Sequence, residues 1–423
     1  MVGTVPADLL ITHIRQLYTV AGPGPLAGPA QSTLEPILDG VLAIEGGRVT
    51  YAGPAIEFDM QLGRGPDTTV VDLGLRYSVV PGFVDPHTHV VYAGNRLPEL
   101  RRRLAGATYA EIAADGGGIV STVEATRRAS AAALASQTRV RLDEMLAAGT
   151  TTAEAKSGYG LDTATERRML EVIKMLNDEH AIDLVPTFMG AHEIPPEYRG
   201  RQSEYVDLVV NEMLPACAPL AEWCDVFCEK GVFTPEESVR ILEAGMALGL
   251  KPRIHADELG PSGGSEAAAL AGAASADHLV HATDAGIGAL LSGGVIATLL
   301  PCAAFYLKLG KFAPARQMID AGLPVALATD VNPGGGFSPS MPFAMALACF
   351  GMNLTFEEAL AGATLNAAAS LERDDEIGSL EEGKLGDAVI VRGDATELLR
   401  INSSPITAVI KRGSLASGAW PRL

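Results

Sequence analysis

The stretch Pro81-Gly-Phe-Val-Asp-Pro-His-Thr-His89 marks the place where the pattern of the sequence changes. On its N-terminal side, short runs typical of strands are separated by turn-forming residues. On its C-terminal side, short apolar runs alternate with longer helical patterns, which indicates repeated strand–helix–strand units. Because such units build a parallel sheet, the sequence predicts an α/β fold from this stretch onward.

Eight of the apolar runs predict the strands of a (β/α)8 barrel. They lie near Asp85–His89, Thr152–Lys156, Val185–Met189, Val226–Cys228, Arg253–His255, Ala276–His278, Ile296–Leu299 and Ala326–Asp330. Helices are expected between them at Val120–Ala147, Ala164–Asn177, Pro235–Ala247 and Gly264–Leu270.

Strand patterns also occur at both ends of the chain. They lie at Asp8–Ile11, Gln16–Val20, Gly40–Ile44, Arg48–Tyr51, Lys384–Arg392 and Ile406–Arg412. We therefore expect a barrel domain at 81–372 and a small β-sandwich domain assembled from both termini, residues 1–80 plus 373–423.

The composition excludes some functions. Of the 423 residues, 48% are hydrophobic and 20% charged, enough for a large core and unlike a disordered chain. The formal net charge of −19 argues against nucleic acid or an anionic membrane as a partner. Neither a secretory signal pattern nor an apolar stretch long enough to span a bilayer is evident, so we expect a cytoplasmic protein.

The five cysteines are odd in number and scattered, so no disulfide framework is expected. Cys224 and Cys228 lie in a strand-like run and are interpreted as buried thiols, because no second Cys or His pair follows at zinc-knuckle spacing. The run Arg101–Arg103 is interpreted as a solvated face or an interface.

The placement of the eight histidines is the main evidence for function. His87 and His89 are two residues apart, so in an extended strand both side chains lie on one face and can reach one ion. His255, His278 and Asp330 each end a different predicted strand, which is where barrel enzymes keep their active sites. The alternative for the first pair, two hydrogen-bonded polar residues in a turn, explains that pair but not the other strand ends.

The sequence resembles the amidohydrolase superfamily in residues 81–89, in the later single histidines and in the closing Thr-Asp330. The resemblance narrows to the imidazolonepropionase family of histidine degradation and extends from about residue 60 to 390. Four segments carry it: Thr88-His-Val-Val-Tyr-Ala-Gly-Asn-Arg96, Thr151-Thr-Ala-Glu-Ala-Lys-Ser-Gly-Tyr-Gly-Leu-Asp162, Thr187-Phe-Met-Gly-Ala-His192 and His255-Ala-Asp-Glu258.

The resemblance implies hydrolysis of the cyclic amide of 4-imidazolone-5-propanoate to N-formimidoyl-L-glutamate, with one divalent ion, Zn or Fe. The implied metal ligands are His87, His89, His255 and Asp330. Three imidazoles and a carboxylate suit either ion, and metal-bound water has a pKa of about 7. Lys156 could in principle bridge two ions as a carboxylated lysine, but nothing in the sequence requires a second ion.

By resemblance, Glu258 is the expected general base, and His278 is expected to hydrogen-bond the carbonyl or the attacking water. Asp330 is a third candidate for part of the base role, and the sequence leaves the division among these three open. An exposed carboxylate at the start of a helix is the alternative for Glu258.

The resemblance also implies the groups that bind the substrate. Arg96 is expected to bind the propanoate, because its planar guanidinium matches a carboxylate. Tyr159, His192 and Glu258 are expected at the ring or tail, and backbone amides near Asn332 and Gly334 are expected to hold the carboxylate. The family usually has Thr or Ser where this chain has Gly335, so a hydroxyl contact is missing there. We expect a small-molecule substrate and a homodimer.

Two other functions fit parts of the sequence. A superfamily deaminase acting on a purine or pyrimidine would use the same ligands, although such enzymes often recognise the base with amide or aromatic residues. A catalytically inactive barrel that serves as a binding protein would have little reason to keep the ligand set together with Glu258.

Overall fold

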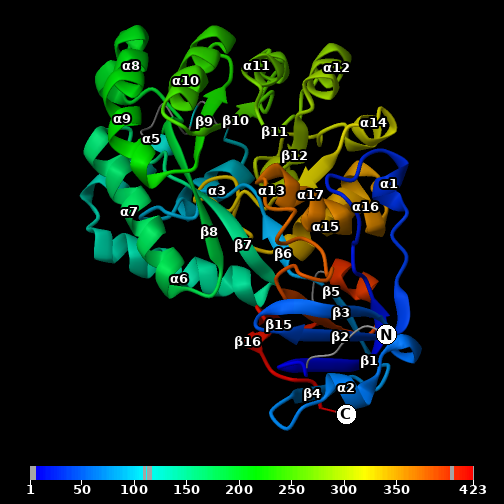
Figure 1. Ribbon diagram of the computed structural model, residues 1–423. Coiled ribbons are helices and arrows are strands. Elements are labelled where there is room, and N and C mark those ends of the chain that lie inside the picture. Colours follow the sequence, from blue (N-terminus) through cyan, green and yellow to red (C-terminus); the bar gives the residue numbers. More distant parts are fainter. Residues whose placement is uncertain (1–5, 108–110, 112–116, 401–403, 423) are drawn as a thin grey trace.

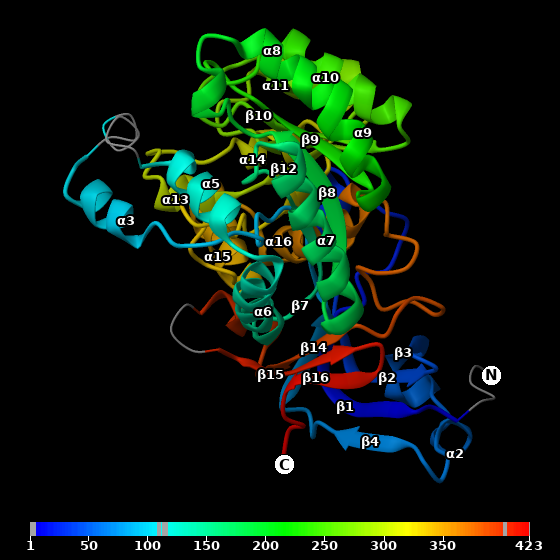
Figure 2. The same cartoon turned by 90° about the vertical axis from the view of Figure 1, so that its left-hand side faces the viewer.

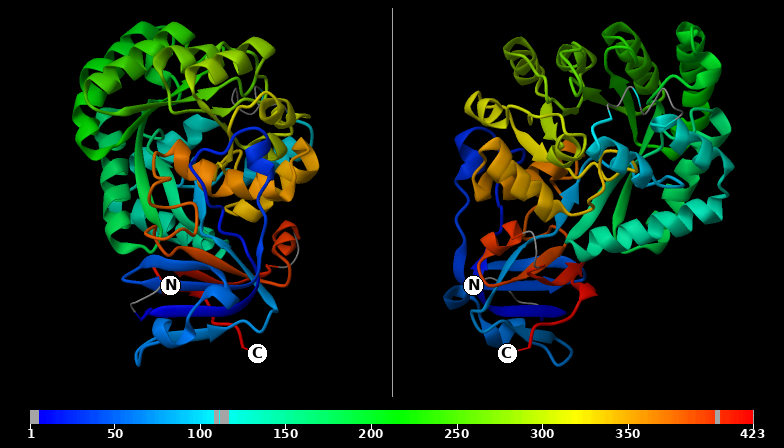
Figure 3. Two further views of the ribbon diagram at one scale, coloured as in Figure 1. Left: turned by 45° about the vertical axis from the view of Figure 1, so that its right-hand side comes forward. Right: turned by 180° about the vertical axis from the view of Figure 1, so that it is seen from behind.

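The computed structural model describes residues 6–107, 111, 117–400 and 404–422. A barrel of parallel strands is surrounded by helices, and a separate mixed sheet built from N-terminal and C-terminal strands lies below it (Figure 1). Figure 3 shows from two further sides that the helices lie outside the barrel strands and that the sheet is set apart at one end. The predicted fold class is confirmed.

The barrel contains eight parallel strands within the described part of the chain. They are β6 (Phe83–Asp85), β7 (Thr150–Lys156), β8 (Asp183–Ala191), β9 (Trp223–Cys228), β10 (Lys251–Ala256), β11 (Ser275–His278), β12 (Ile296–Leu299) and β13 (Val325–Leu327). Each overlaps a predicted strand, but β6 and β13 end earlier than predicted. His87, His89 and Asp330, which follow these two strands, therefore lie outside the regular strand pairing.

The first and last strands of the barrel are joined by the segments that follow them. The amide of Asp330 donates to the carbonyl of His87 at 3.2 Å, and the amide of His89 donates to the carbonyl of Val331 at 3.0 Å. These bonds place the His-Thr-His segment directly beside the segment that carries Asp330.

The helices pack on the outside of the barrel, and Figure 2 shows α3 at its rim. They are α3 (Leu97–Leu104), α5 (Ile119–Arg128), α6 (Ala131–Ala147), α7 (Thr163–Glu179), α8 (Gln202–Leu208), α9 (Leu214–Cys217), α10 (Pro235–Ala247), α11 (Gly264–Ala271), α12 (Asp284–Gly293), α13 (Pro301–Tyr306), α14 (Ala315–Asp320), α15 (Met341–Met352), α16 (Phe356–Ala363) and α17 (Leu365–Ser370).

The single helix predicted at Val120–Ala147 is wrong, because the chain forms two helices there, α5 and α6. Ala129 has an extended backbone that ends α5, and the side chain of Ser130 accepts a hydrogen bond from the amide of Ala133 at 3.2 Å. A serine that caps a helix in this way starts a new one. The alanine-rich composition on both sides hid the boundary.

The terminal sheet is mixed and draws strands from both ends of the chain. They are β1 (Leu9–Leu17), β2 (Ile37–Glu45), β3 (Arg48–Pro54), β4 (Thr69–Asp72), β5 (Tyr77–Pro81), β14 (Ala388–Arg392), β15 (Ile406–Lys411) and β16 (Ser414–Gly418). Their order is β16-β15-β14-β5-β1-β2-β3, with β4 paired to β1.

The two strands predicted at Asp8–Ile11 and Gln16–Val20 are one strand, β1. Its register against β2 shifts between Ile11 and Ile14, where His13 has φ 48°. This bulge interrupts the alternation of apolar residues, so the sequence pattern suggested a break where the strand continues.

The sheet and the barrel are held together by buried polar contacts. The ammonium of Lys411 in β15 donates to the Asp387 carboxylate at 2.7 Å and to the carbonyl of Thr151 in β7 at 2.9 Å. The short helix α1 (Pro29–Ser32) packs against the barrel helix α16 instead of the sheet, and Gln31 donates to the carbonyl of Val325 at 3.0 Å. The division of the chain after residues 80 and 372 stays a prediction.

Two further expectations concern cysteines and membranes. Cys224 and Cys228 are free and buried in β9, which confirms their interpretation as buried thiols. None of the helices in the described ranges is both long and apolar enough to cross a bilayer.

Candidate functional site

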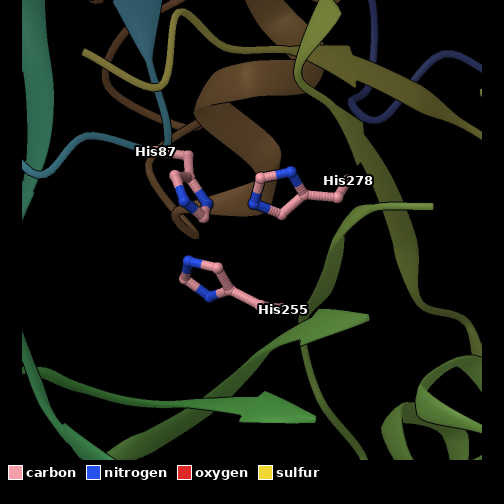
Figure 4. Close-up of side chains that lie close together, drawn as sticks. All are labelled: His87, His255 and His278. Carbon is pink, nitrogen blue, oxygen red and sulfur yellow. The ribbon is translucent and has the colours of Figure 1, made fainter. Parts of the chain in front are cut away.

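The five strand-end residues singled out in the sequence come together at one end of the barrel. His87 and His89 follow β6, His255 lies in β10, His278 ends β11 and Asp330 follows β13. Figure 4 shows the imidazoles of His87, His255 and His278 pointing toward a common space. His278 and Asp330 have φ of 76° and 53°, a backbone conformation that side chains rarely adopt and that often marks functional sites.

The donor atoms of these residues are spaced as ligands of one ion would be. The Nε2 atoms of His89 and His255 are 3.2 Å apart, and Asp330 Oδ1 is 3.8 Å from His87 Nε2 and 3.7 Å from His89 Nε2. Two nitrogens on a tetrahedral zinc lie roughly 3.4 Å apart. His87 Nε2 and Asp330 Oδ1 are buried without a hydrogen-bond partner among the described residues. The site therefore fits a divalent metal ion.

Buried carboxylates hold two of the imidazoles in place from behind. Asp277 lies 2.6 Å from His87 Nδ1, and Asp225 lies 3.0 Å from His255 Nδ1. In each ring Nδ1 carries the proton shared with the carboxylate, which leaves Nε2 available to an ion. Neither aspartate was predicted from the sequence, although an acid inside an apolar strand, as in Trp-Cys-Asp225-Val-Phe, is a signal for such a role.

Lys156 does not have the surroundings of a bridging carboxylated lysine. Its buried ammonium donates to Glu154 at 2.8 Å and to Asp225 at 2.7 Å. Although burial acts to lower it, these two carboxylates raise the pKa of Lys156, so the side chain is a cation. Burial acts to raise the pKa of Asp225, but His255 and Lys156 hold this pKa well below its usual range.

Burial and charge favour neutral histidines in this site. Burial, together with nearby cationic groups, lowers the pKa of His87, His89 and His278 well below the usual range. Burial and the nearby Glu258 raise the pKa of Asp330 well above its usual range. Asp330 is thus a buried acid beside these imidazoles, and a metal cation would stabilise its charged form.

A cavity of about 350 Å³ opens over this cluster. Every residue that the sequence placed in the site lines it except His87, which is buried completely. The lining includes His89, Arg96, Tyr159, His192, His255, Glu258, His278, Asp330, Asn332 and Gly334. The alternative that Glu258 is an exposed carboxylate at the start of a helix is wrong, because Glu258 is only 8% exposed and lines the cavity.

Arg96 lies in the cavity wall against the backbone of Gly334. Its Nε donates to Glu99 at 2.8 Å, and the residue is buried. A Cβ added to Gly334 would lie 2.1 Å from Arg96 Nη1, so only glycine leaves room for this guanidinium. The amides of Gly334 and Gly335 donate to Asn332 Oδ1 at 2.8 and 2.6 Å. Binding of a carboxylate by amides in this turn stays a prediction.

Gly334→Ala should therefore weaken substrate binding by displacing Arg96, and we expect KM to rise roughly tenfold. Gly335→Ala is the matched control, because the three atoms nearest to a Cβ there are side-chain carbons of Leu307, at 3.2–3.4 Å. Steady-state kinetics of Gly334→Ala, Arg96→Met and the double variant measure the coupling. If the two single losses multiply in the double variant, Gly334 does not act through Arg96.

The interpretation of Arg101–Arg103 as a solvated face is wrong for Arg103. Arg101 and Arg102 are exposed, whereas Arg103 is 6% exposed and lines the cavity. Its guanidinium donates to the carbonyls of Tyr306 and Gly334, each at 2.8 Å. It therefore joins the C-terminal end of α13 to the loop that carries Gly334, a role that a run of three arginines does not reveal.

Tyr159 and His192 line the cavity on another side. His192 Nδ1 donates to the carbonyl of Gly158 at 2.9 Å, and its ring stacks on His89 with centroids 4.7 Å apart. Burial lowers the pKa of His192 to about 3, so the ring is neutral. Its Nε2 therefore has a free lone pair that can accept a hydrogen bond.

The fold and the site can now be compared with known proteins. Residues 229–416 match the amidohydrolase family. The chain is 48% identical over 415 residues to the imidazolonepropionase of Symbiobacterium thermophilum, covering 97% of both chains. It is 50% identical over 387 residues to that of Geobacillus kaustophilus, covering 90% of this chain and 91% of the relative. The chain belongs to the imidazolonepropionase family. Like other members of the family, it is a hydrolase that acts on a carbon–nitrogen bond of a small molecule.

A solved structure supports the fold of this family member. An adenosine deaminase from Xanthomonas campestris with bound zinc superposes with a TM-score of 0.69 at 18% identity, over 97% of this chain and 93% of that one. At this identity the likeness shows the fold alone, so it does not favour the deaminase alternative.

Proposed function

We propose that this cavity hydrolyses the ring amide of 4-imidazolone-5-propanoate to N-formimidoyl-L-glutamate. The observation that carries the proposal is that one cavity combines the histidine–aspartate cluster with the buried guanidinium of Arg96. The cluster suits amide hydrolysis and the guanidinium suits the carboxylate tail, and imidazolone propanoate contains both groups. Assembly as a homodimer and a cytoplasmic location stay predictions.

His87, His89, His255 and Asp330 are the proposed ligands of one Zn or Fe ion. Three imidazoles and one carboxylate form a donor set typical of either metal. Such an ion supplies a polarised carbonyl and a water whose pKa is lowered to about 7. The ion pair with Asp225 occupies the Lys156 ammonium, which argues against Lys156 as a carboxylated bridge to a second ion.

Glu258 is the proposed general base. Its Oε1 lies 3.6 Å from His278 Nδ1, so the two side chains face the same part of the cavity. Glu258 accepts a proton from the attacking water and returns it to the ring nitrogen as the carbon–nitrogen bond breaks. His278 donates a hydrogen bond to the developing oxyanion, and Asp330 is the remaining candidate for part of the base role.

Arg96 is the proposed partner of the propanoate, with Tyr159, His192, Asn332 and Gly334 completing the binding site. Charge-assisted bonds to a carboxylate in a buried pocket are worth about 1.5–3 kcal/mol. Arg96→Met keeps the apolar stem and removes the guanidinium, so kcat/KM should fall by roughly ten- to a hundredfold. Steady-state assays of wild type and variant measure this loss.

The control for Arg96→Met is an imidazolone without the propanoate. It should be a poor substrate for wild type and no poorer for the variant. Equal losses on both substrates would show that Arg96 has only a structural role, and the assignment of the tail would then be wrong.

A further inference from the structure

The loop that carries Tyr159 into the cavity is bound to a single buried carboxylate. This loop, residues 157–161, connects β7 to α7, and Glu166 lies in the first turn of α7 with no exposed surface. Glu166 Oε2 accepts from the amide of Gly158 at 2.8 Å. Its Oε1 accepts from the amides of Gly160 at 2.7 Å and Leu161 at 2.9 Å. Three backbone amides of this loop are thus fixed by one side chain.

The same loop determines which nitrogen of His192 carries the proton. The Gly158 carbonyl can only accept, so His192 Nδ1 must donate to it at 2.9 Å. Gly158 has φ 102°, and a Cβ there would lie 3.0 Å from His192 Nδ1, so the backbone approaches the ring closely. Because Nδ1 is bound to the Gly158 carbonyl, Nε2 is the ring nitrogen left to contact a ligand in the cavity that His192 lines. Glu166 therefore acts on His192 indirectly: it holds Gly158, and the carbonyl of Gly158 accepts the hydrogen bond from His192 Nδ1.

The loop is also fixed from its carbonyl side. Arg127 donates through Nε to the carbonyl of Gly160 at 2.7 Å and through Nη2 to that of Leu161 at 3.1 Å. Glu166 binds the amide and Arg127 the carbonyl of the peptide group between Gly160 and Leu161, so this group is held from both sides. Tyr159 directly precedes it, with its ring 5.2 Å from that of His192 and 5.7 Å from that of His89.

We propose that Glu166 is a positioning residue for substrate binding: it holds Tyr159 in the cavity and fixes His192 as an Nε2 acceptor. With Nδ1 bound to the backbone, His192 Nε2 fits a ring N–H of the substrate, which connects the loop to recognition of the imidazolone ring. The proposal deepens the proposed function and rests on it for the identity of the substrate. The effect on the His192 tautomer does not depend on the substrate.

Glu166→Gln tests the proposal, because the new amide group places a donor against a backbone donor. With zinc-loaded protein and imidazolone propanoate, KM should rise roughly tenfold while kcat changes less than about threefold and metal content stays that of wild type. Nitrogen NMR of His192 should show a single Nδ1–H tautomer in wild type and a mixture in the variant. Glu171→Gln is the matched control, since Glu171 lies on the same helix, is exposed and pairs with Arg167.

Glu166→Asp keeps two carboxylate oxygens and should give a KM between those of wild type and Glu166→Gln. It also carries the test if Glu166→Gln does not fold. A folded Glu166 variant with wild-type KM and a single His192 tautomer would overturn the proposal, and so would equal changes in Glu171→Gln. If wild type does not hydrolyse imidazolone propanoate, the proposed function is wrong, and the tautomer measurement still decides the role of Glu166.

Discussion

Replacing His255 by alanine is expected to remove most of the bound metal and to lower activity by several orders of magnitude while the chain stays folded. The substitution deletes one of four proposed ligands, and its Nε2 is the atom that lies 3.2 Å from His89 Nε2. The carboxylate behind it keeps a partner, because Asp225 remains paired with Lys156 at 2.7 Å. Loss of metal should therefore not be accompanied by unfolding. Elemental analysis and circular dichroism of the purified variant measure the two effects.

His87→Ala should behave in the same way, since its Nε2 is buried and lacks a hydrogen-bond partner among the described residues. His281→Ala is the matched control: it also lies near the end of β11 but does not line the cavity. Wild-type metal content in both His87→Ala and His255→Ala would show that the ligand assignment is wrong.

Glu258→Gln is expected to lower kcat by roughly 10²-fold or more while the enzyme still binds metal and substrate. Glutamine keeps the shape of the side chain but accepts no proton. Burial, reinforced by the nearby Glu229, raises the pKa of Glu258 to about 8, and a bound cation would lower it. Because the carboxylate form is the base, activity should fall as the pH drops through this pKa, and the variant should lose that acidic limb.

The measurement for Glu258 is the pH dependence of kcat for wild type and variant. Glu193→Gln is a matched control, because Glu193 also lines the cavity and burial also raises its pKa. A near-wild-type kcat in Glu258→Gln would transfer the base role to Asp330 or His278.

The sequence predicts the site residues that lie at the ends of successive barrel strands. His255, His278 and Asp330 were found because each ends a predicted strand, and parallel strands bring such residues to one end of a barrel. His87 was found by its spacing from His89. The eight strands followed from the same alternation. Resemblance to the family, and not spacing, supplied the roles of Arg96 and Glu258.

The parts that the sequence did not predict depend on contacts between distant segments. Asp225 and Asp277 contact the Nδ1 atoms of His255 and His87. Predicting these contacts requires knowing how β9 and β11 lie relative to β10 and β6. In the sequence Arg103 cannot be told from its two exposed neighbours. Only the position of α3 shows that its guanidinium donates to the carbonyl of Gly334. Glu166 lies in a helical pattern like any first-turn acid, and only the fold of residues 157–161 shows its three amide partners.

The most direct test of the central claim is to incubate purified, metal-loaded protein with freshly generated 4-imidazolone-5-propanoate and to identify the product by mass. Loss of the imidazolone absorbance should accompany a product with the mass of the substrate plus one water, with both nitrogens retained. In water labelled with heavy oxygen, one labelled atom should enter the new carboxylate. Release of ammonia, or failure to consume the imidazolone while a purine or pyrimidine is turned over, would contradict the claim and favour a deaminase.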